Sequence, residues 1–413
     1  MPPTAQGNAL CAVLHRLDGS MISVQDALAH INAVRPNPLV ETVAVTEAIG
    51  RVLSNDLTAL IDMPPFFSAN MDGYAVSECQ TEDRLNIIGE SAAGHPFAGH
   101  ISQGQAVRIS TGSMMPSGAE RVLMQEHVKR VGNEITVKLA SSPESHVRAA
   151  ASDFVAGTVL LTAGHRLRAG DLTLAAAAGH FQIEVFRKLK VAMFSSGDEL
   201  QQIGKELTSG HIYAANSVGL KALLQEWGAD VTNFGIVKDC PEAVSGLISQ
   251  VADYDIILPI GGASVGDHDL MRPAFRDAGF QVIFETVAVR PGKPSWMGKR
   301  VDQIVFGLPG NPASAFVCAH LFLKPALGLE TIFLPASLDN FLEENGPRET
   351  YLRGQAFIRD GQICVRVQTP QESFRLRPQS DANALIKIPP LGGPYVQGDP
   401  VNIILMGELA YEG

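Results

Sequence analysis

The sequence predicts a multidomain α/β protein, and three observations lead to this prediction. The chain has 413 residues, enough for roughly two to four domains, and it is 46% hydrophobic and 18% charged, as expected of a globular protein with sizeable cores. Between residues 189 and 331, β-type and helical segments alternate, which is typical of a parallel sheet with helices on both faces. Around residues 55–150 and after residue 345, short β-type runs predict two smaller, mainly β domains.

The N-terminal part predicts helix on either side of a β region. Ser23 precedes an amphipathic stretch and Asp26 follows three residues later, which indicates an N-cap with a capping box, and this helix should end near Pro36. Residues 158–186 are strongly apolar and predict further helix. Between these helices the expected β runs are residues 84–88, 105–109, 121–124 and 134–137.

An α/β region and a final β region follow. In the first, we expect strands at 190–194, 230–237, 255–260, 281–289 and 303–308, and helices at 217–227, 242–252, 270–277 and 314–327. In the second, β-type runs at 351–357, 363–367, 385–388 and 401–405 predict a small barrel or sandwich.

Charge and cysteine usage exclude several classes of protein. Lys and Arg number 32 against 43 Asp and Glu, a net charge of −11, which argues against a nucleic-acid binder. A local basic pocket can still bind a small anionic ligand. No apolar run is long enough to span a bilayer, and the start has no signal-peptide pattern. The five cysteines are scattered without a C-x-x-C motif, which favours a cytoplasmic protein with free thiols over a zinc site or disulfide framework.

Three loops rich in Gly, Ser and Asp follow strands of the α/β region. They are residues 194–200, 261–267 and 307–315. Ligands of such sheets bind outside the carboxyl ends of the strands, so the loops together predict a binding site at one edge. Any one alone could be an ordinary strand-to-helix turn, because such turns favour glycine and capping residues. The substrate-binding candidates on these loops are Gly261, Gly262, Ser264, Gly266, Pro309, Gly310, Asn311 and Ser314.

Two cations stand where they could serve the same edge. Arg290 and Lys293 lie in the sequence RPGKP, whose prolines restrict the backbone. We interpret the pair as a clamp for phosphate or another oxyanion, for which Arg is suited by its bidentate geometry. The alternative interpretation is that RPGKP forms a solvated turn and that its cations are ordinary surface charges.

Carboxylates occur beside the expected phosphate loops. Asp267 and Asp269 follow the second loop, Asp198 and Glu199 lie on the first, and Asp239 follows the strand at 230–237. A magnesium ion bridging carboxylates and phosphate oxygens would explain this combination. Alternatively, Asp267 or Asp269 caps the helix that begins near residue 270.

Two further stretches lie in the first β region. Residues 64–76 contain MDGYAV, and residues 108–119 read RISTGSMMPSGA, which offers hydroxyls and backbone N–H groups beside glycines. Each could contact a ligand or form a turn.

Taken together, these motifs resemble one family. MDGYAV, RISTGSMMPSGA, SSGDEL, GGASVGDHD, RPGKP and GLPGNPASA, in this order and spacing, are similar to those of the molybdopterin molybdenumtransferases of the MoeA type, shared with the E domain of gephyrin. The resemblance runs from roughly residue 20 to the C-terminus. It implies an elongated homodimer with the active cleft between subunits. It also implies four domains: a discontinuous helical one (20–54 and 155–187), a mainly β insert (55–154), an α/β domain akin to molybdopterin adenylyltransferases (188–332) and a C-terminal β-barrel (333–413).

The resemblance also implies a reaction: insertion of molybdenum, from molybdate, into adenylylated molybdopterin with magnesium and release of AMP, the last step of molybdenum cofactor biosynthesis. A molybdopterin adenylyltransferase and molybdoenzyme apoproteins are implied partners. By motif position the catalytic candidates are Asp72, Thr111, Glu199, Asp239 and Lys293, Arg290 is a substrate-binding candidate, and the metal ligands are Asp267, Asp269 and Glu199.

The chain departs from the family pattern at several positions. Arg290 stands where the family usually has Lys, and an acid is absent at Phe67 and at Ala214. Ser152 replaces a glutamate, and Phe374 replaces a glycine in the last domain. These changes leave two other hypotheses open: a diverged paralogue that binds or carries the pterin or acts as a scaffold with little turnover, and a different nucleotide-dependent enzyme on the same frame. Molybdate and tungstate are too similar in size for the sequence to separate them.

Overall fold

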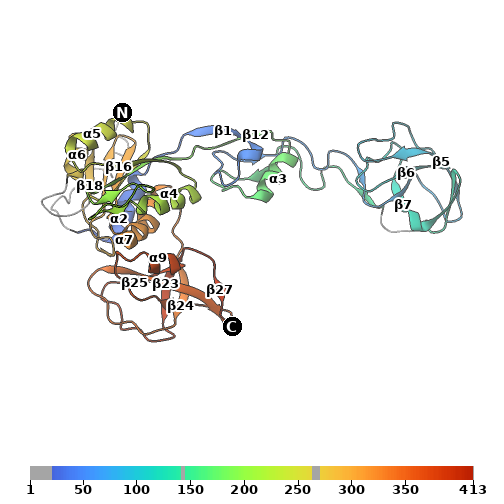
Figure 1. Ribbon diagram of the computed structural model, residues 1–413. Helices are drawn as coiled ribbons and strands as arrows, with labels where there is room; N and C mark the ends of the chain where they lie inside the picture. The colour runs from blue at the N-terminus through green and yellow to red at the C-terminus, as the bar shows by residue number, and fades with distance from the viewer. Residues whose placement is uncertain (1–20, 141–144, 263–269, 413) are drawn as a thin grey trace, which may run out of the picture. The chain divides into compact units, whose positions relative to one another are not determined.

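The structure, a computed structural model, describes residues 21–140, 145–262 and 270–412 (Figure 1). The contacts divide the chain into two compact units. The small unit comprises residues 39–187, and the large unit comprises residues up to 38 together with those from 188 onward. The four-domain division implied by the resemblance is finer than this and stays a prediction.

Helix α2 (Val24–Val34) opens the large unit. Ser23 Oγ accepts the Asp26 N–H at 3.0 Å and donates to the Asp26 carboxylate at 2.8 Å, so the N-cap expected from the sequence is present. Val24, Ala27 and Ile31, at helical spacing, are buried in the same cluster as the α/β sheet. This helix therefore packs with the α/β core, although the resemblance grouped it with residues 155–187.

A six-stranded sheet forms the centre of the large unit, in the order β16-β13-β17-β21-β20-β18. The first four strands are parallel, β20 runs antiparallel to β21, and β18 runs antiparallel to β20. The four strands of the βαβ units are parallel as expected, and the unexpected strand β20 makes the sheet mixed. Sequence reading missed β20 because it begins only two residues after RPGKP and returns to β21 through a tight turn. The strands are β13 (Lys190–Ser196), β16 (Asp230–Val237), β17 (Ile256–Ile260), β18 (Gln281–Phe284), β20 (Trp296–Arg300) and β21 (Gln303–Gly307).

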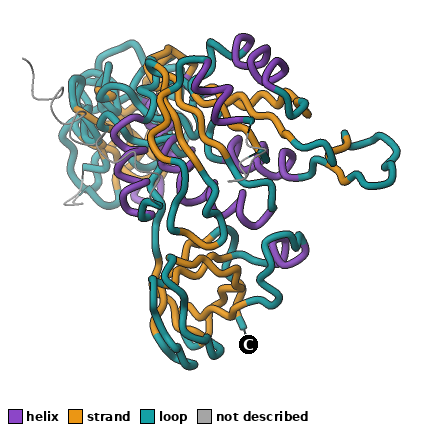
Figure 2. The backbone as a smooth tube through the Cα atoms, turned by 90° about the vertical axis from the view of Figure 1, so that its left-hand side faces the viewer, coloured by secondary structure: helices purple, strands orange, loops and turns teal. Residues whose placement is uncertain are grey.

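Helices cover both faces of this sheet (Figures 1 and 2). On β13, Val191 and Met193 belong to one buried cluster whereas Ala192 and Phe194 belong to another, so alternate side chains face opposite layers. Helices α4 and α7 pack in the first cluster, and α5 and α6 in the second. The three-layer α/β architecture is confirmed. The helices are α4 (Asn216–Glu226), α5 (Pro241–Gln250), α6 (Met271–Asp277) and α7 (Pro312–Cys318), which continues through the π-helical segment η3 (Ala319–Leu323) into α8 (Lys324–Ala326).

The C-terminal sheet closes into a barrel, as the sequence predicted. Its order is β23-β24-β22-β26-β25, and β25 pairs again with β23. A short strand from the RPGKP region, β19 (Val289–Arg290), pairs with β23 and joins the barrel to the α/β part. The remaining elements are β22 (Leu334–Leu338), β23 (Glu349–Arg359), β24 (Gln362–Val367), α9 (Arg377–Asp381), β25 (Ala384–Ile388), β26 (Pro400–Leu405) and β27 (Ala410–Tyr411).

The small unit contains a second six-stranded sheet, in the order β7-β4-β6-β5-β9-β8. The helix expected at 158–186 is shorter than predicted. Only α3 (Ala169–Ala177) is helical there, between turns at Gly164 and Gly179, which both have positive φ. The sheet strands are β4 (Gly73–Val76), β5 (Arg84–Ser91), β6 (Gln105–Ile109), β7 (Arg121–Met124), β8 (Val128–Val131) and β9 (Glu134–Val137). The paired short strands are β1 (Val40–Ala44) with β12 (Gln182–Phe186), β2 (Leu57–Thr58) with β11 (Val159–Leu161) and β3 (Ser68–Ala69) with β10 (Val147–Arg148).

Candidate functional site

The ends of β13, β17 and β21 meet at one edge of the large unit's sheet. Gly261, directly after β17, donates its N–H to the carbonyl of Leu308 at 3.0 Å. On its other side, a Cβ at Gly261 would lie 2.3 Å from the carbonyl oxygen of Ser196. Gly261 also has φ +90°, so both its conformation and its surroundings require glycine. The structure thus brings together the start of all three loops that the sequence singled out.

The second loop leaves this edge through Gly262. Gly262 has φ +62°, and a Cβ there would lie 2.8 Å from the Met271 side chain. Of the other predicted residues of this loop, Ser264, Gly266, Asp267 and Asp269 lie outside the described residues.

The third loop, after β21, is fixed by two side chains from elsewhere. Asn216, at the start of α4, donates to the Gly310 carbonyl at 2.7 Å. Asn311 donates to Ser373 Oγ at 3.1 Å, and the Ala313 N–H donates to the Ser373 carbonyl at 3.0 Å. Gly310 lies close to Gly261, since a Cβ on Gly310 would be 3.6 Å from the Gly261 Cα. The loop therefore contacts both the sheet edge and the barrel segment that carries Ser373.

A cavity of about 330 Å³ lies where the RPGKP turn meets the barrel. Three of the lining residues are cations: Arg290, Lys293 and Arg348. Arg290 and Lys293 are exposed, and neither forms an ion pair with another described residue. Ser314 and Ser373 add hydroxyls, and the one acid of the lining is Glu372. The cavity is suited to a small oxyanion because positive charge and hydroxyl donors dominate its wall. Its full lining is Arg290, Pro291, Gly292, Lys293, Pro294, Ser314, Arg348, Thr350, Tyr351, Leu352, Gln371, Glu372 and Ser373.

Hydrogen bonds and close packing fix the backbone of the RPGKP turn. The Val287 N–H donates to the Lys293 carbonyl at 3.0 Å, and Ser295 Oγ donates to the Gly292 carbonyl at 2.9 Å. Gly292 has φ +121° and packs on the buried thiol of Cys318, where a Cβ would be 2.3 Å from Sγ. The two cations therefore stand on a fixed backbone.

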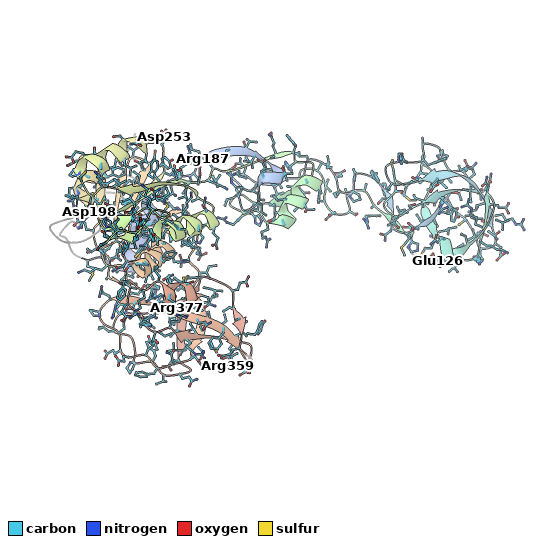
Figure 3. The ribbon with its side chains drawn as sticks, in the orientation of Figure 1. Glu126, Arg187, Asp198, Asp253, Arg359 and Arg377 are labelled. Carbon is cyan, nitrogen blue, oxygen red and sulfur yellow. The ribbon has the colours of Figure 1, made fainter. Side chains whose placement is uncertain are left out.

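Two predicted carboxylates lie near the ends of neighbouring strands. Glu199 is exposed on the loop after β13, next to Asp198 (Figure 3), and its carboxylate folds against Gly197, where a Cβ would be 2.6 Å from Oε2. Asp239 is half-buried just after β16, the strand that pairs with β13. Both acids thus belong to the strand-end edge.

Asp72 and Thr111 form a site of their own in the small unit. Asp72 Oδ1 accepts the Thr111 N–H at 2.7 Å and the Thr111 hydroxyl at 2.8 Å. These residues meet because β4 and β6 are antiparallel and pair Gly73 with Ile109. The backbone and hydroxyl hydrogen bonds from Thr111 lower the pKa of Asp72, assisted by the charge of Arg108. Asp72 is therefore an exposed, ionised carboxylate at neutral pH.

The two altered motifs of the small unit are neighbours. Strand β3, just after Phe67, pairs with β10, and the Arg148 guanidinium donates to Asn70 Oδ1 at 3.0 Å. Phe67 is 57% exposed. Ser152 is also exposed. Sequence differences that are far apart in the chain thus fall on one surface of the unit.

The expected magnesium site is only partly described. Among residues 21–140, 145–262 and 270–412, no three His, Cys, Asp or Glu side chains are grouped to hold a metal ion. Glu199 is the one expected ligand within these residues, and its carboxylate oxygens are donors of the kind magnesium prefers.

Sequence reasoning missed Arg348 and the lining role of residues 371–373. Arg348 follows Gly346 and Pro347 before β23, and nothing in that local pattern distinguishes it from a turn residue. Gln371, Glu372 and Ser373 reach the cavity only because the barrel packs against the α/β part. Asn216 lies just before the helix expected at 217–227, and nothing in the local pattern indicated its contact with Gly310.

These features define a class of protein: a multidomain α/β protein with a glycine-lined strand-end edge and a cationic cavity. Family models match almost the whole described chain. They are the MoeA N-terminal region (domain I and II) at residues 22–179, a probable molybdopterin binding domain at 192–328 and the MoeA C-terminal region (domain IV) at 335–406.

Individual relatives agree with these matches. Proteins named molybdopterin molybdenumtransferase from a Nostoc species and from Haemophilus influenzae are each 35% identical to this chain. The alignments cover 78% of this chain and 78% of the first relative, and 74% and 77% for the second. The crystal structure of the molybdopterin biosynthesis MoeA protein from Pyrococcus horikoshii matches with a TM-score of 0.81 and 29% identity, over 94% of this chain and 100% of that one.

The chain belongs to the MoeA family. It is a transferase with a role in molybdenum cofactor biosynthesis. None of the helices in the described part of the chain is long and apolar enough to cross a membrane.

Proposed function

We propose that this enzyme inserts molybdenum, supplied as molybdate, into adenylylated molybdopterin with the help of magnesium and releases AMP. The observation that carries the proposal is the 330 Å³ cavity lined by Arg290, Lys293 and Arg348, beside the glycine loops of the sheet edge. The first feature suits a small oxyanion, and the second suits a phosphate-bearing ligand whose oxygens must approach the backbone closely.

The cations and loops would divide the binding between them. Arg290 and Lys293 face the cavity without an ion pair to any described residue, so an entering oxyanion would not have to displace a protein carboxylate. Arg290 can form a bidentate contact, whereas Lys293 acts as a compact point charge. The phosphates and pterin would bind next to this oxyanion, on the loop residues Gly261, Gly262, Pro309, Gly310, Asn311 and Ser314.

Glu199, with Asp267 and Asp269, would hold the magnesium ion. When bound, the ion offsets negative charge on the oxygens of the phosphoanhydride link. Asp239 stands at the same edge and would orient the ligand's polar groups. Asp72, ionised and held by Thr111, would be a further catalytic carboxylate.

The reaction is tested by incubating the purified protein with adenylylated molybdopterin, molybdate and magnesium and measuring AMP. We expect AMP release that depends on both molybdate and magnesium. No AMP under saturating conditions would contradict the proposal.

One observation favours a second candidate function, that of a diverged paralogue that binds or carries the pterin with little turnover. Phe67 and Phe374 are 57% and 63% exposed, at positions where the family pattern has other residues. A paralogue that binds or carries the pterin would show tight binding without AMP formation and would not restore an insertase-deficient bacterium.

The same proposal includes a homodimer and a cytoplasmic location. Its partners would be a molybdopterin adenylyltransferase, which makes the substrate, and the apoproteins of molybdoenzymes, which receive the product. Sedimentation of the purified protein tests the dimer directly.

A further inference from the structure

A buried thiol lies against the turn that carries Arg290 and Lys293. Cys318, the last residue of α7, and Ser295, two residues after Lys293, are both 0% exposed. Ser295 Oγ lies 2.9 Å from the Gly292 carbonyl, to which it donates, and 3.1 Å from Cys318 Sγ. The thiol itself is 3.8 Å from the same carbonyl. These two side chains therefore join the RPGKP turn to the helix in the protein interior.

The contact between the thiol and the turn is close. Gly292 has φ +121°, and a Cβ on it would lie 2.3 Å from Cys318 Sγ and 3.3 Å from Val289 Cγ1. Only glycine allows the turn to approach the helix in this way, so the residue at position 318 determines how near the turn comes. A smaller side chain would leave a gap below Gly292, and a larger one would push the turn away from α7.

The same face of α7 contributes to the cavity wall. Ser314 and Cys318 are four residues apart on this helix, so they lie on one face of it. A Cβ on Gly292 would be 3.9 Å from the Ser314 carbonyl oxygen. Ser314 lines the 330 Å³ anion cavity together with Arg290 and Lys293. One helix face thus holds the turn and supplies a residue of the cavity.

The position of the turn matters for its backbone as well as for its cations. The N–H groups of Gly292 and Lys293 donate to no acceptor among the residues that the structure describes, and both residues line the anion cavity. A long side chain such as that of Lys293 can adjust to a small shift of the backbone, whereas backbone N–H groups move with it. Because hydrogen bonds weaken steeply when distance and angle change, a shifted turn would bind an oxyanion less well.

The thiol that supports the turn is also electrically neutral. Burial raises the pKa of the Cys318 thiol to about 12, although the hydrogen bond from Ser295 opposes this shift. At neutral pH the side chain therefore places no negative charge next to the turn that carries the two cations. It fills the space below Gly292 without weakening an anion site.

We infer that Cys318, together with Ser295, is a positioning residue for oxyanion binding: it sets how closely the RPGKP turn lies against α7. The placement of Arg290 and Lys293 relative to Ser314 then follows from the size of the side chain at position 318. This inference rests on the proposed function of the anion cavity.

The test uses the full-length protein with molybdate as the probe, the dissociation constant being measured by calorimetry and the folded state by thermal unfolding. Cys318→Val and Cys318→Ala should each bind molybdate about tenfold more weakly, comparable to the loss of one hydrogen bond to a charged group. Cys318→Ser should bind within about threefold of the wild type, because its hydroxyl can still bond Ser295. The matched control is Cys364→Val, at a buried thiol on β24 that does not line the cavity, and it should bind within about twofold.

A double-mutant cycle separates positioning from a general loss of stability. Lys293→Gln should weaken molybdate binding in the wild-type background and have a smaller effect in Cys318→Val or Cys318→Ala, because Lys293 is already displaced there.

Four results would overturn the inference while leaving the proposed function intact: wild-type affinity in a folded Cys318→Val or Cys318→Ala protein, no better binding in Cys318→Ser than in Cys318→Ala, equal weakening in Cys364→Val, or additive effects in the cycle. If the wild-type protein itself binds no molybdate, the proposed function of the cavity is refuted and the role of Cys318 with it.

Discussion

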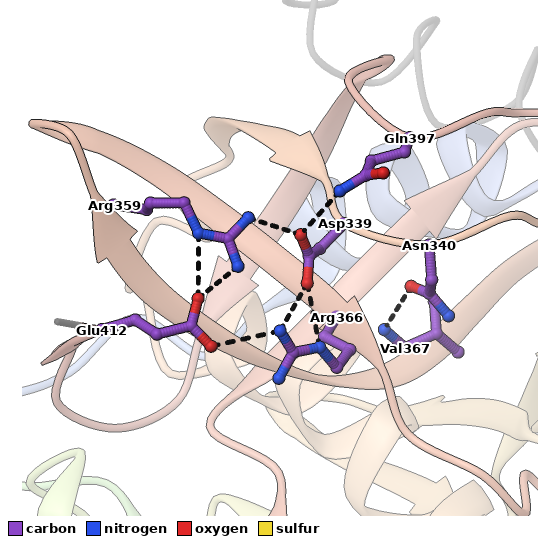
Figure 4. A network of polar contacts seen from close by, with 7 residues as sticks. All are labelled: Asp339, Asn340, Arg359, Arg366, Val367, Gln397 and Glu412. Atoms are coloured by element: carbon purple, nitrogen blue, oxygen red, sulfur yellow. Dashed lines mark hydrogen bonds and ion pairs between the residues drawn. The ribbon is translucent and has the colours of Figure 1, made fainter.

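Two arginine-rich regions of the large unit show opposite arrangements of charge. In the barrel, Arg359 and Arg366 share the carboxylates of Asp339 and Glu412 (Figure 4). The lining of the anion cavity contains the cations Arg290, Lys293 and Arg348 and a single acid, Glu372. The first region pairs its cations with carboxylates, whereas Arg290 and Lys293 of the second form no ion pair with a described residue. Arginines that are paired stabilise a fold, whereas arginines held on a rigid backbone without a carboxylate indicate a binding site.

The barrel network is closely coupled. Arg359 donates to Asp339 Oδ1 at 2.6 Å and to Glu412 Oε2 at 2.9 Å, and Arg366 donates to Asp339 Oδ2 at 2.9 Å through Nε. The Asp339 side chain is 7% exposed. Hydrogen bonds from Arg359 first, and from Arg366, hold the pKa of Asp339 below its usual value. Because Glu412 is near the C-terminus, the network also fixes the end of the chain to the barrel.

The largest expected effect is on binding at the cavity. The double variant Arg290→Gln/Lys293→Gln should weaken molybdate binding by roughly 10²–10⁴-fold, since each charge-assisted contact contributes roughly 1.5–3 kcal/mol and about 1.4 kcal/mol is tenfold in affinity. The unfolding temperature should stay within about 2 °C, because neither cation is paired to a described residue. Calorimetry and thermal unfolding measure the two quantities. If the double variant kept the wild-type affinity for molybdate, or lost much of its stability, the contrast between the anion cavity and the barrel network would be wrong.

The barrel network should respond in the opposite way. Asp339→Asn leaves Glu412 as the one carboxylate of the network that the two arginines still share, and should lower the free energy of unfolding by about 1–3 kcal/mol, less than for a fully buried pair because both arginines are partly exposed. Molybdate affinity should not change. Urea unfolding at neutral pH measures the effect, and Arg377→Gln, whose partner Asp381 is exposed, is the control. Equal losses in both variants would show that the network is ordinary surface charge.

The network also predicts a pH dependence. The folded pKa of Asp339 is lower than its unfolded value of about 3.9, so its contribution to stability is present above that value and is lost as the pH falls through the folded pKa. The acid limb of the stability profile should therefore be shallower in Asp339→Asn than in the wild type. An identical slope below pH 4 would contradict this account.

The smallest expected effect concerns the small unit. Thr111→Val removes the hydroxyl that donates to Asp72 and keeps the backbone N–H bond, so the pKa of Asp72 should rise toward its usual value without reaching it. Carboxyl titration by NMR measures the shift. AMP formation should fall by about tenfold, as for loss of one hydrogen bond to a charged group. An unchanged Asp72 titration would mean that the hydroxyl bond is not formed in solution.

The sequence could predict the elements whose signal is local. The run Ile256–Ile260 and its glycines identified a central strand and the edge of the sheet where the three loops begin. Strand β20 was missed because it is short and follows a proline-rich turn. The apolar stretch around Leu172 was extended too far, since composition does not show where Gly164 and Gly179 turn the chain. The sequence therefore could not predict elements, or element ends, whose pattern is short or interrupted by turn residues.

The residues of the candidate site also divide into those that the sequence could predict and those that it could not. The loops at Gly261 and Gly310 and the cations Arg290 and Lys293 were recognisable because each sits in a distinctive local motif. Arg348 was not, because its place in the cavity lining depends on how the barrel packs against the α/β part. Tertiary contacts of that kind leave no trace in a single sequence.

The central claim is that Arg290 and Lys293, which form no ion pair with a described residue, bind the anion, rather than the paired Arg359 and Arg366. A crystal of the protein soaked with tungstate, located by anomalous scattering, tests it most directly. The account predicts the strongest peak within hydrogen-bonding distance of Arg290 and Lys293, in the cavity shared with Ser373. A strongest peak at Arg359 and Arg366, or none in that cavity, would contradict it.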